Sequence, residues 1–96
     1  MPSVSRHLTV VDPSGLHARP AARFVQAASR FESRIVIEHR GREADAKSLI
    51  AILGLTLRPS SEISLTADGP DAEAAITALT QELAPYVASV PESEIA

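Results

Sequence analysis

Hydrophobic and polar residues alternate in some parts of the chain and recur every three or four positions in others. Alternation indicates β-strands, because successive side chains of a strand point to opposite faces, and the longer period indicates amphipathic helices. Alternation and β-branched residues together predict four strands. These strands cover Val4 to Val11, Arg34 to His39, Arg42 to Ala44 and Glu62 to Ala67.

The helical period appears in three segments. The first runs from about Ala18 to Arg30 and the second, a short one, from Ser48 to about Leu53. Either Ser48 or Asp45 is expected as the N-cap of the short helix. The third helix follows the turn formers Asp68-Gly69-Pro70, with the proline near its first position. It should bury one apolar stripe, made of Ala72, Ala75, Ile76, Leu79 and Leu83.

The elements follow one another in the order β-α-β-β-α-β-α. Half-polar strands separated by amphipathic helices indicate an α+β fold of the open-faced β-sandwich type. We expect a four-stranded antiparallel sheet with the three helices on one face. We expect residues 1–84 to form the domain. Residues 85–96 have weak periodicity and contain two prolines, so we expect a C-terminal tail there.

Composition excludes several kinds of function. Aromatic residues make up 3% of the 96 residues, too few for a surface that stacks single-stranded nucleic acid, and the net charge of −3 disfavours nucleic-acid binding. The lack of cysteine excludes disulfides and thiolate sites, and no histidine pair has metal-ligand spacing, so neither metal nor cofactor is expected. No secretory leader and no membrane-spanning run is recognisable, so we expect a cytoplasmic protein without membrane insertion.

Of the three histidines, His17 lies where phosphate chemistry is plausible, between the turn formers Asp12 to Gly15 and a predicted helix start. Such a start offers unpaired N–H donors and the positive end of the helix dipole, which suits an anion. Pro20 has no N–H, so Ala18 and Arg19 should supply the amides, and the Arg19 guanidinium can add two hydrogen bonds to phosphate oxygens. The imidazole could therefore accept a phosphoryl group, although His17 as a mere helix cap is the alternative.

The run Gly15-Leu16-His17-Ala18-Arg19-Pro20-Ala21 resembles the active-site signature of HPr, the histidine-containing phosphocarrier family of the phosphoenolpyruvate-dependent phosphotransferase system. Ala46-Lys47-Ser48-Leu49 resembles the second signature of that family, and the resemblance extends from about Val4 to Leu83. It implies that His17 accepts a phosphoryl group on Nδ1 from phosphorylated enzyme I, with Arg19 stabilising the phosphate. His17 would then pass the group to enzyme IIA-type or IIB-type partners in sugar uptake and its regulation. This activity is that of a carrier rather than a stand-alone enzyme, and we expect a monomer.

The resemblance also implies a regulatory site and a docking surface. Ser48 matches a serine that a dedicated kinase phosphorylates in part of the family, in which case a serine kinase and phosphatase are further partners. A capping serine explains Ser48 equally well without any kinase. The short helix has more apolar side chains than it can bury, so some should remain exposed to partners. The expected docking residues are Ala18, Ala21, Ala22, Leu49, Ile50 and Leu53.

Three other functions stay open at this stage. The chain could serve a nitrogen-regulatory branch of the same family rather than sugar uptake. It could be a regulatory module that binds an anion without covalent chemistry, or an independent histidine phosphatase or transferase. A site with one histidine, one arginine and no further polar residues to bind a substrate disfavours the last two.

Overall fold

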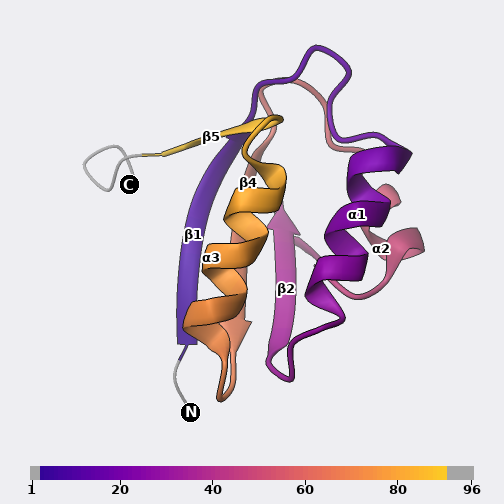
Figure 1. The fold of residues 1–96 in the computed structure, drawn as a ribbon. Coiled ribbons are helices and arrows are strands. Elements are labelled where there is room, and N and C mark those ends of the chain that lie inside the picture. Colours follow the sequence, from indigo (N-terminus) through magenta and orange to yellow (C-terminus); the bar gives the residue numbers. More distant parts are fainter. Residues whose placement is uncertain (1–2, 91–96) are drawn as a thin grey trace.

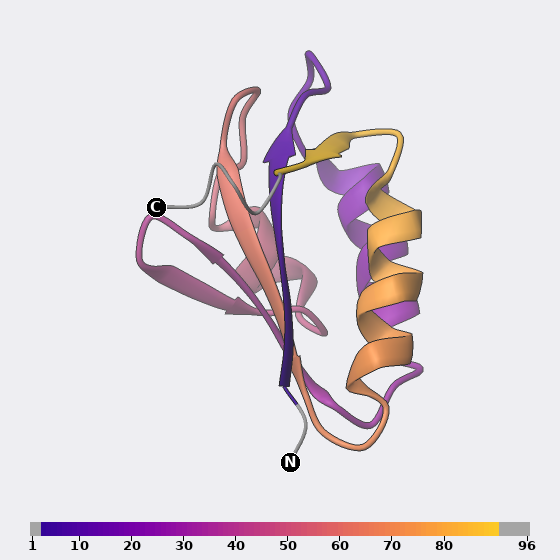
Figure 2. The ribbon, with the colours of Figure 1, turned by 90° about the vertical axis from the view of Figure 1, so that its left-hand side faces the viewer.

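A five-stranded antiparallel sheet forms one layer of the structure, and helices form the other (Figures 1 and 2). The computed structural model describes residues 3–90. The strands lie in the order β3-β2-β4-β1-β5 across the sheet. In chain order the elements are β1 (Ser3–Val10), α1 (Ala18–Ala28), β2 (Arg34–His39), β3 (Arg42–Asp45), α2 (Leu49–Leu53), β4 (Glu62–Asp68), α3 (Ala72–Leu83) and β5 (Val87–Ser89). The α+β fold class predicted from the sequence is thus confirmed.

The expected number of four strands is wrong, because β5 adds a fifth at the edge beside β1. Val10 lies opposite Val87 in this pairing, and the backbone N–H of Val11 continues it by donating to the Tyr86 carbonyl at 2.9 Å. Tyr86 and Val87 also pack against the core. A strand of three residues is too short to show alternation, so its partner β1 is what defines it. The sheet therefore continues past residue 84 into the expected tail, whose residues 91–96 lie outside the described part.

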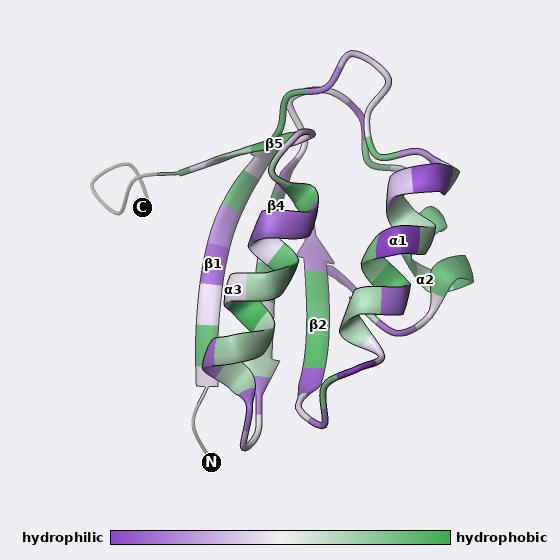
Figure 3. Ribbon diagram, in the orientation of Figure 1, coloured by the Kyte–Doolittle hydropathy of each residue, from purple (hydrophilic) through white to green (hydrophobic). Residues whose placement is uncertain are grey.

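The two faces of the sheet differ in the way the alternating pattern predicts. Ile35, Ile37 and Leu65 are buried on the face that α1 and α3 cover (Figure 2). The apolar stripe predicted for α3 is confirmed, since all of its members are buried, and Phe24 of α1 is fully buried as well. Helix α2 packs against α1 and beside β3. In Figure 3, β1 has separate green and purple segments, whereas β2 is green through its middle and purple at its ends.

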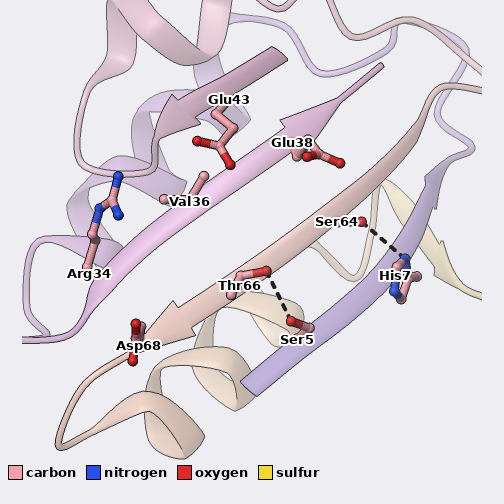
Figure 4. Close-up of a pocket in the computed structure, with 9 residues that line it drawn as sticks. All are labelled: Ser5, His7, Arg34, Val36, Glu38, Glu43, Ser64, Thr66 and Asp68. Atoms are coloured by element: carbon pink, nitrogen blue, oxygen red, sulfur yellow. Dashed lines mark hydrogen bonds between the residues drawn. The ribbon is translucent and has the colours of Figure 1, made fainter. Parts of the chain in front are cut away.

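The opposite face of the sheet is polar and uncovered by helices, which makes the sandwich open-faced. A shallow hollow of about 330 Å³ lies over β1, β4 and β2 on this face (Figure 4). Two cross-strand hydrogen bonds tie β1 to β4 there: Ser5 with Thr66 at 3.1 Å, and the Ser64 hydroxyl with His7 Nδ1 at 3.1 Å. His7 is therefore a half-buried sheet residue with a structural partner.

Helix α3 begins later than the sequence predicted. Asp71 is its N-cap residue and Ala72 its first helical residue, so Pro70 lies outside the helix rather than near its first position. The reason is a contact distant in sequence: the Asp71 carboxylate accepts hydrogen bonds from the backbone N–H groups of Glu32 and Ser33, both at 2.9 Å. Asp71 thereby joins the loop before β2 to the start of α3.

Candidate functional site

The turn before α1 is held in one conformation by several hydrogen bonds. Asp12 Oδ2 accepts from the Ser14 N–H at 2.9 Å, and the Asp12 carbonyl accepts from the Gly15 N–H at 2.9 Å. Glycine is required at position 15 for two reasons: its φ is +67°, and a side chain there would collide with the Leu57 carbonyl oxygen. The Leu57 carbonyl also accepts from the N–H of Leu16, whose side chain is buried. The residue that precedes His17 is therefore fixed.

His17 is the N-cap residue of α1, with extended backbone angles of φ −87° and ψ −173°. Its carbonyl accepts the first intrahelical hydrogen bond, from Ala21 N–H at 3.1 Å. Its side chain makes no capping hydrogen bond and is exposed. His17 thus occupies the position of a cap while its imidazole does not act as one.

The other two histidines behave differently. His7 Nδ1 hydrogen-bonds the Ser64 hydroxyl, and His39 Nδ1 donates to the Glu62 carbonyl at 3.0 Å. Both rings are half-buried and held by the sheet. Within residues 3–90, His17 alone among the histidines has a ring that is exposed and without a hydrogen-bond partner.

The start of α1 has open donors next to this imidazole. The first four N–H groups of a helix begin without an acceptor in the preceding turn. Here Pro20 has no N–H and Ala21 N–H is used by the His17 carbonyl, which leaves the amides of Ala18 and Arg19. No acidic residue lies in the first turn, and the Arg19 side chain is exposed. The helix start can therefore receive an anion through two amides and one guanidinium.

The second predicted site residue, Ser48, caps the short helix. Its hydroxyl oxygen accepts a hydrogen bond from the Ala51 N–H at 3.3 Å, so Ser48 and not Asp45 is the N-cap of α2. Asp45 instead holds the turn before it, accepting from Lys47 N–H at 2.9 Å. Lys47 Nζ in turn donates to the Phe31 carbonyl at 2.7 Å, which ties this turn to the segment after α1.

The expected docking residues divide into three groups by exposure. Ile50 is 84% exposed and Leu53 39%, so α2 does leave apolar side chains on the surface, while Ala18 is exposed as well. Ala22 and Leu49 are half-buried. Ala21 is fully buried, because it lies on the side of α1 that faces the sheet, and its side chain therefore cannot contact a partner. Helix α1, which carries Ala18 and Ala22, packs against α2, which carries Ile50 and Leu53.

One further apolar side chain is exposed just after β1. Val11 is 54% exposed, and by alternation it shares the face of His7 and Thr9 rather than that of the buried Leu8 and Val10. Its exposure therefore follows from the strand pattern.

Comparison with known proteins gives a consistent result. The sequence matches the PTS-HPr family, the PTS HPr component phosphorylation site, over residues 4–84. Among solved structures, a histidine-containing phosphocarrier protein from Mycoplasma is 33% identical with a TM-score of 0.80, covering 88% of this chain and 93% of that chain. A phosphocarrier protein HPr from Bacillus anthracis is 41% identical with a TM-score of 0.78, covering 85% and 98%. An HPr from Thermoanaerobacter tengcongensis is also 41% identical, with a TM-score of 0.74 and coverages of 84% and 89%.

Two further features of the described residues bear on membrane and metal binding. Within residues 3–90, no helix has the length and apolar character needed to cross a bilayer. The same residues contain no cluster of three or more potential metal ligands of the histidine, cysteine or acidic type. The family match over most of the chain, together with the similar structures, shows that this chain belongs to the HPr phosphocarrier family of the phosphotransferase system.

Proposed function

We propose that His17 accepts a phosphoryl group from phosphorylated enzyme I and passes it to enzyme IIA-type partners in phosphoenolpyruvate-dependent sugar uptake and its regulation. The observation that supports this most directly is the exposed, unpaired imidazole at the start of α1, next to the open amides of Ala18 and Arg19. In His7 and His39 the Nδ1 atom is already in a hydrogen bond, which would have to break before that atom could attack phosphorus.

The transfer is an in-line displacement at phosphorus. The lone pair of a neutral imidazole nitrogen, Nδ1 by the family pattern, forms the new P–N bond while the bond between phosphorus and the donor atom of enzyme I breaks with its electron pair. The amides of Ala18 and Arg19 and the Arg19 guanidinium receive the phosphoryl oxygens, whose negative charge the helix start favours. Onward transfer repeats the step with the acceptor side chain of the next protein as nucleophile.

Hydrolysis of the stored group should be slow, which distinguishes a carrier from a phosphatase. A positioned general base would accelerate attack by water, and the nearest carboxylate along the chain, Asp12, already accepts the Ser14 N–H. The first turn of α1 contains no acidic residue. The residues around His17 therefore favour keeping the phosphoryl group until a protein partner receives it.

Docking and regulation follow from the neighbourhood of α1 and α2. Ala18 and Ala22 of α1, with Leu49, Ile50 and Leu53 of α2, would form the partner surface of a monomeric domain in the cytoplasm. Phosphorylation of Ser48 by a serine kinase would place a nearly divalent anion at the start of α2, beside this surface, and would weaken docking to enzyme I. The exposed Ile50 side chain supports the docking role, since a burial of its apolar surface stabilises a complex.

The test is to incubate the chain with enzyme I and phosphoenolpyruvate and to measure its intact mass. We expect one added phosphoryl group, labile in acid, stable in base and located on His17 by peptide mapping. Variants His7→Ala and His39→Ala serve as matched controls and should be phosphorylated at the rate of the unmodified chain. Phosphate affinity without a covalent adduct would support an anion-binding module, and turnover of a free phosphoester without enzyme I would support a phosphatase.

A further inference from the structure

A second concave site lies at the same end of the sheet as the turn before α1, and His17 is not among its residues. It is a cavity of about 430 Å³ between the β2–β3 turn and the segment that links α2 to β4. Ser60 N–H donates to the Val10 carbonyl at 2.7 Å, which places this linking segment beside the end of β1 (Figures 1 and 2). Its lining residues are His39, Arg40, Arg42, Leu55, Thr56, Arg58, Pro59, Ser60 and Ser61.

The cavity is strongly basic although the chain as a whole is acidic. Arg40, Arg42 and Arg58 supply three guanidinium groups to a chain whose net charge is −3. All three side chains are exposed, and no carboxylate belongs to the lining. Arginines gathered without a counter-charge repel one another, and an anion in the cavity relieves that repulsion.

Neutral donors accompany the charges. The Ser61 hydroxyl oxygen accepts the Arg58 N–H at 2.9 Å, so the proton of that hydroxyl is free to be donated elsewhere. Thr56 and Ser60 add two exposed hydroxyls to the wall. A second hydrogen bond, from Ser61 N–H to the Arg58 carbonyl at 3.0 Å, closes the turn that carries these groups. Hydroxyls and guanidinium groups on a fixed turn are donors suited to phosphate oxygens.

The backbone at this cavity adopts angles that its side chains disfavour. Within the described residues, the non-glycine positions with left-handed φ are Arg40 at 53°, Thr56 at 53° and Ser60 at 75°, and each lines the cavity. Arg40 stands at the first position of the β2–β3 turn, where asparagine, aspartate or glycine is preferred. Threonine is β-branched, so it is unfavourable in this region of backbone space. Conformational cost gathered around one hollow is typical of a functional site.

We propose that this cavity binds a small molecule carrying more than one phosphate group. One phosphate can engage two guanidinium groups through paired hydrogen bonds, so three arginines exceed the need of a single phosphate. The volume is within the range of small-ligand sites, roughly 300–1,000 Å³. A concave wall with hydroxyl donors favours a compact phosphorylated ligand over an acidic protein segment, which would need an extended track of charge.

The experiment is a titration of the isotope-labelled protein with inorganic pyrophosphate, followed by amide chemical shifts, at an ionic strength of about 0.1 M, where charges more than about 10 Å apart are largely screened. We expect saturable shifts at Arg40, Thr56 and Ser60, with inorganic phosphate binding about ten-fold more weakly than pyrophosphate. The triple variant Arg40→Gln, Arg42→Gln, Arg58→Gln should lose at least about ten-fold in affinity. A matched triple variant that removes the same charge elsewhere, Arg6→Gln, Arg23→Gln, Arg30→Gln, should change it less than about two-fold.

Three results would overturn the proposal. Pyrophosphate shifts confined to Ala18 and Arg19 would assign the anion affinity to the start of α1 alone. Equal losses in the two triple variants would show that only net charge matters. A hexaglutamate peptide that saturates the same amides as tightly as pyrophosphate would indicate an acidic protein partner instead of a phosphorylated small molecule.

Discussion

The turns before α1 and α2 share one hydrogen-bond pattern around an aspartate, but the two helix starts are capped differently. Before α1, Asp12 accepts a hydrogen bond on its carboxylate from the N–H two residues on, and on its carbonyl from the N–H three residues on. Before α2, Asp45 does the same with Lys47 N–H and Ser48 N–H, each at 2.9 Å. Ser48 then caps its helix with its own hydroxyl, whereas His17 leaves its helix start open.

The start of α2 has a capping hydrogen bond from its own N-cap side chain, whereas the start of α1 keeps amide donors that a ligand can use. A capping serine stabilises a helix by about 1 kcal/mol, so the Ser48 hydroxyl already has a structural role. His17 provides no such contribution, and the amides of Ala18 and Arg19 stay available. An uncapped start next to an exposed imidazole is consistent with a phosphoryl group completing the first turn of α1.

The largest effect should come from His17→Ala. Phosphoryl transfer from enzyme I should disappear, because no other imidazole in residues 3–90 is both exposed and unpaired. The free energy of unfolding should change by less than about 0.5 kcal/mol, as expected for an exposed side chain without partners. Intact mass after incubation with enzyme I and phosphoenolpyruvate, together with urea unfolding, checks both parts. An alanine variant that still becomes phosphorylated contradicts the assignment.

Arg19→Gln should have the next largest effect. The variant keeps the backbone amide and removes the guanidinium, so the rate of transfer should fall about ten- to hundred-fold, the equivalent of one or two charge-assisted hydrogen bonds. The transfer rate of Arg19→Lys should lie between those of Arg19→Gln and the unmodified chain, since lysine keeps the charge but cannot form the paired hydrogen bonds of a guanidinium. Rapid-quench phosphorylation kinetics measure this order. Arg30→Gln, at the other end of the first helical region, is the matched control and should leave the rate within about two-fold.

The turn before α1 depends on a distant segment, which Gly15→Ala would test. Alanine at this position must adopt a positive φ and also collide with the Leu57 carbonyl, so we expect a loss of about 2–4 kcal/mol in unfolding free energy. Gly41→Ala is the matched control: its φ is +79°, but nothing lies within 4 Å of the added carbon. Only the strain term, about 1 kcal/mol, should appear there. Equal losses in urea unfolding would mean that the Leu57 contact is unimportant.

This dependence shows what the sequence predicts and what it leaves out. The start of α1 and the buried stripe of α3 follow from patterns within one segment, and the structure contains both. β5 and the late start of α3 could not be predicted in this way. Each is set by a partner far along the chain: β1 for the strand, and the backbone of Glu32 and Ser33 for Asp71.

The docking set and the basic cavity illustrate the same limit at the level of side chains. Ala21 belongs to the signature run, yet only the packing of α1 on the sheet shows that it faces inward. Arg40 and Arg58 are separated by a helix in the sequence, and their shared cavity appears once β2 and β4 pair. Patterns within a segment indicate which residues carry chemistry, while tertiary pairing decides which of them meet.

Ser48 variants would show whether the second helix start has a role beyond capping. Ser48→Ala should lower the unfolding free energy by about 1 kcal/mol and leave phosphorylation of His17 unchanged. Ser48→Asp keeps a good capping group and adds negative charge, so stability should be retained while affinity for enzyme I falls. Urea unfolding and calorimetric titration with enzyme I separate the two properties. An aspartate variant that binds enzyme I as tightly as the unmodified chain would leave Ser48 with capping alone.

The start of α3 is the third helix start to compare, and a change of its N-cap residue, Asp71, should have the smallest effect. The Asp71 carboxylate turns away from its own helix, and hydrogen bonds from the Ser33 hydroxyl and then the Glu32 amide lower its pKa from 3.8. A lowered folded-state pKa means that this stabilisation is complete above the unfolded value, about 3.8, and is lost as the pH falls through the folded one. The melting temperature of Asp71→Asn should be lower than that of the unmodified chain at pH 7. It should fall less than that of the unmodified chain between pH 7 and pH 3. Parallel melting curves across that range would show that the carboxylate charge does not contribute to joining this loop to α3.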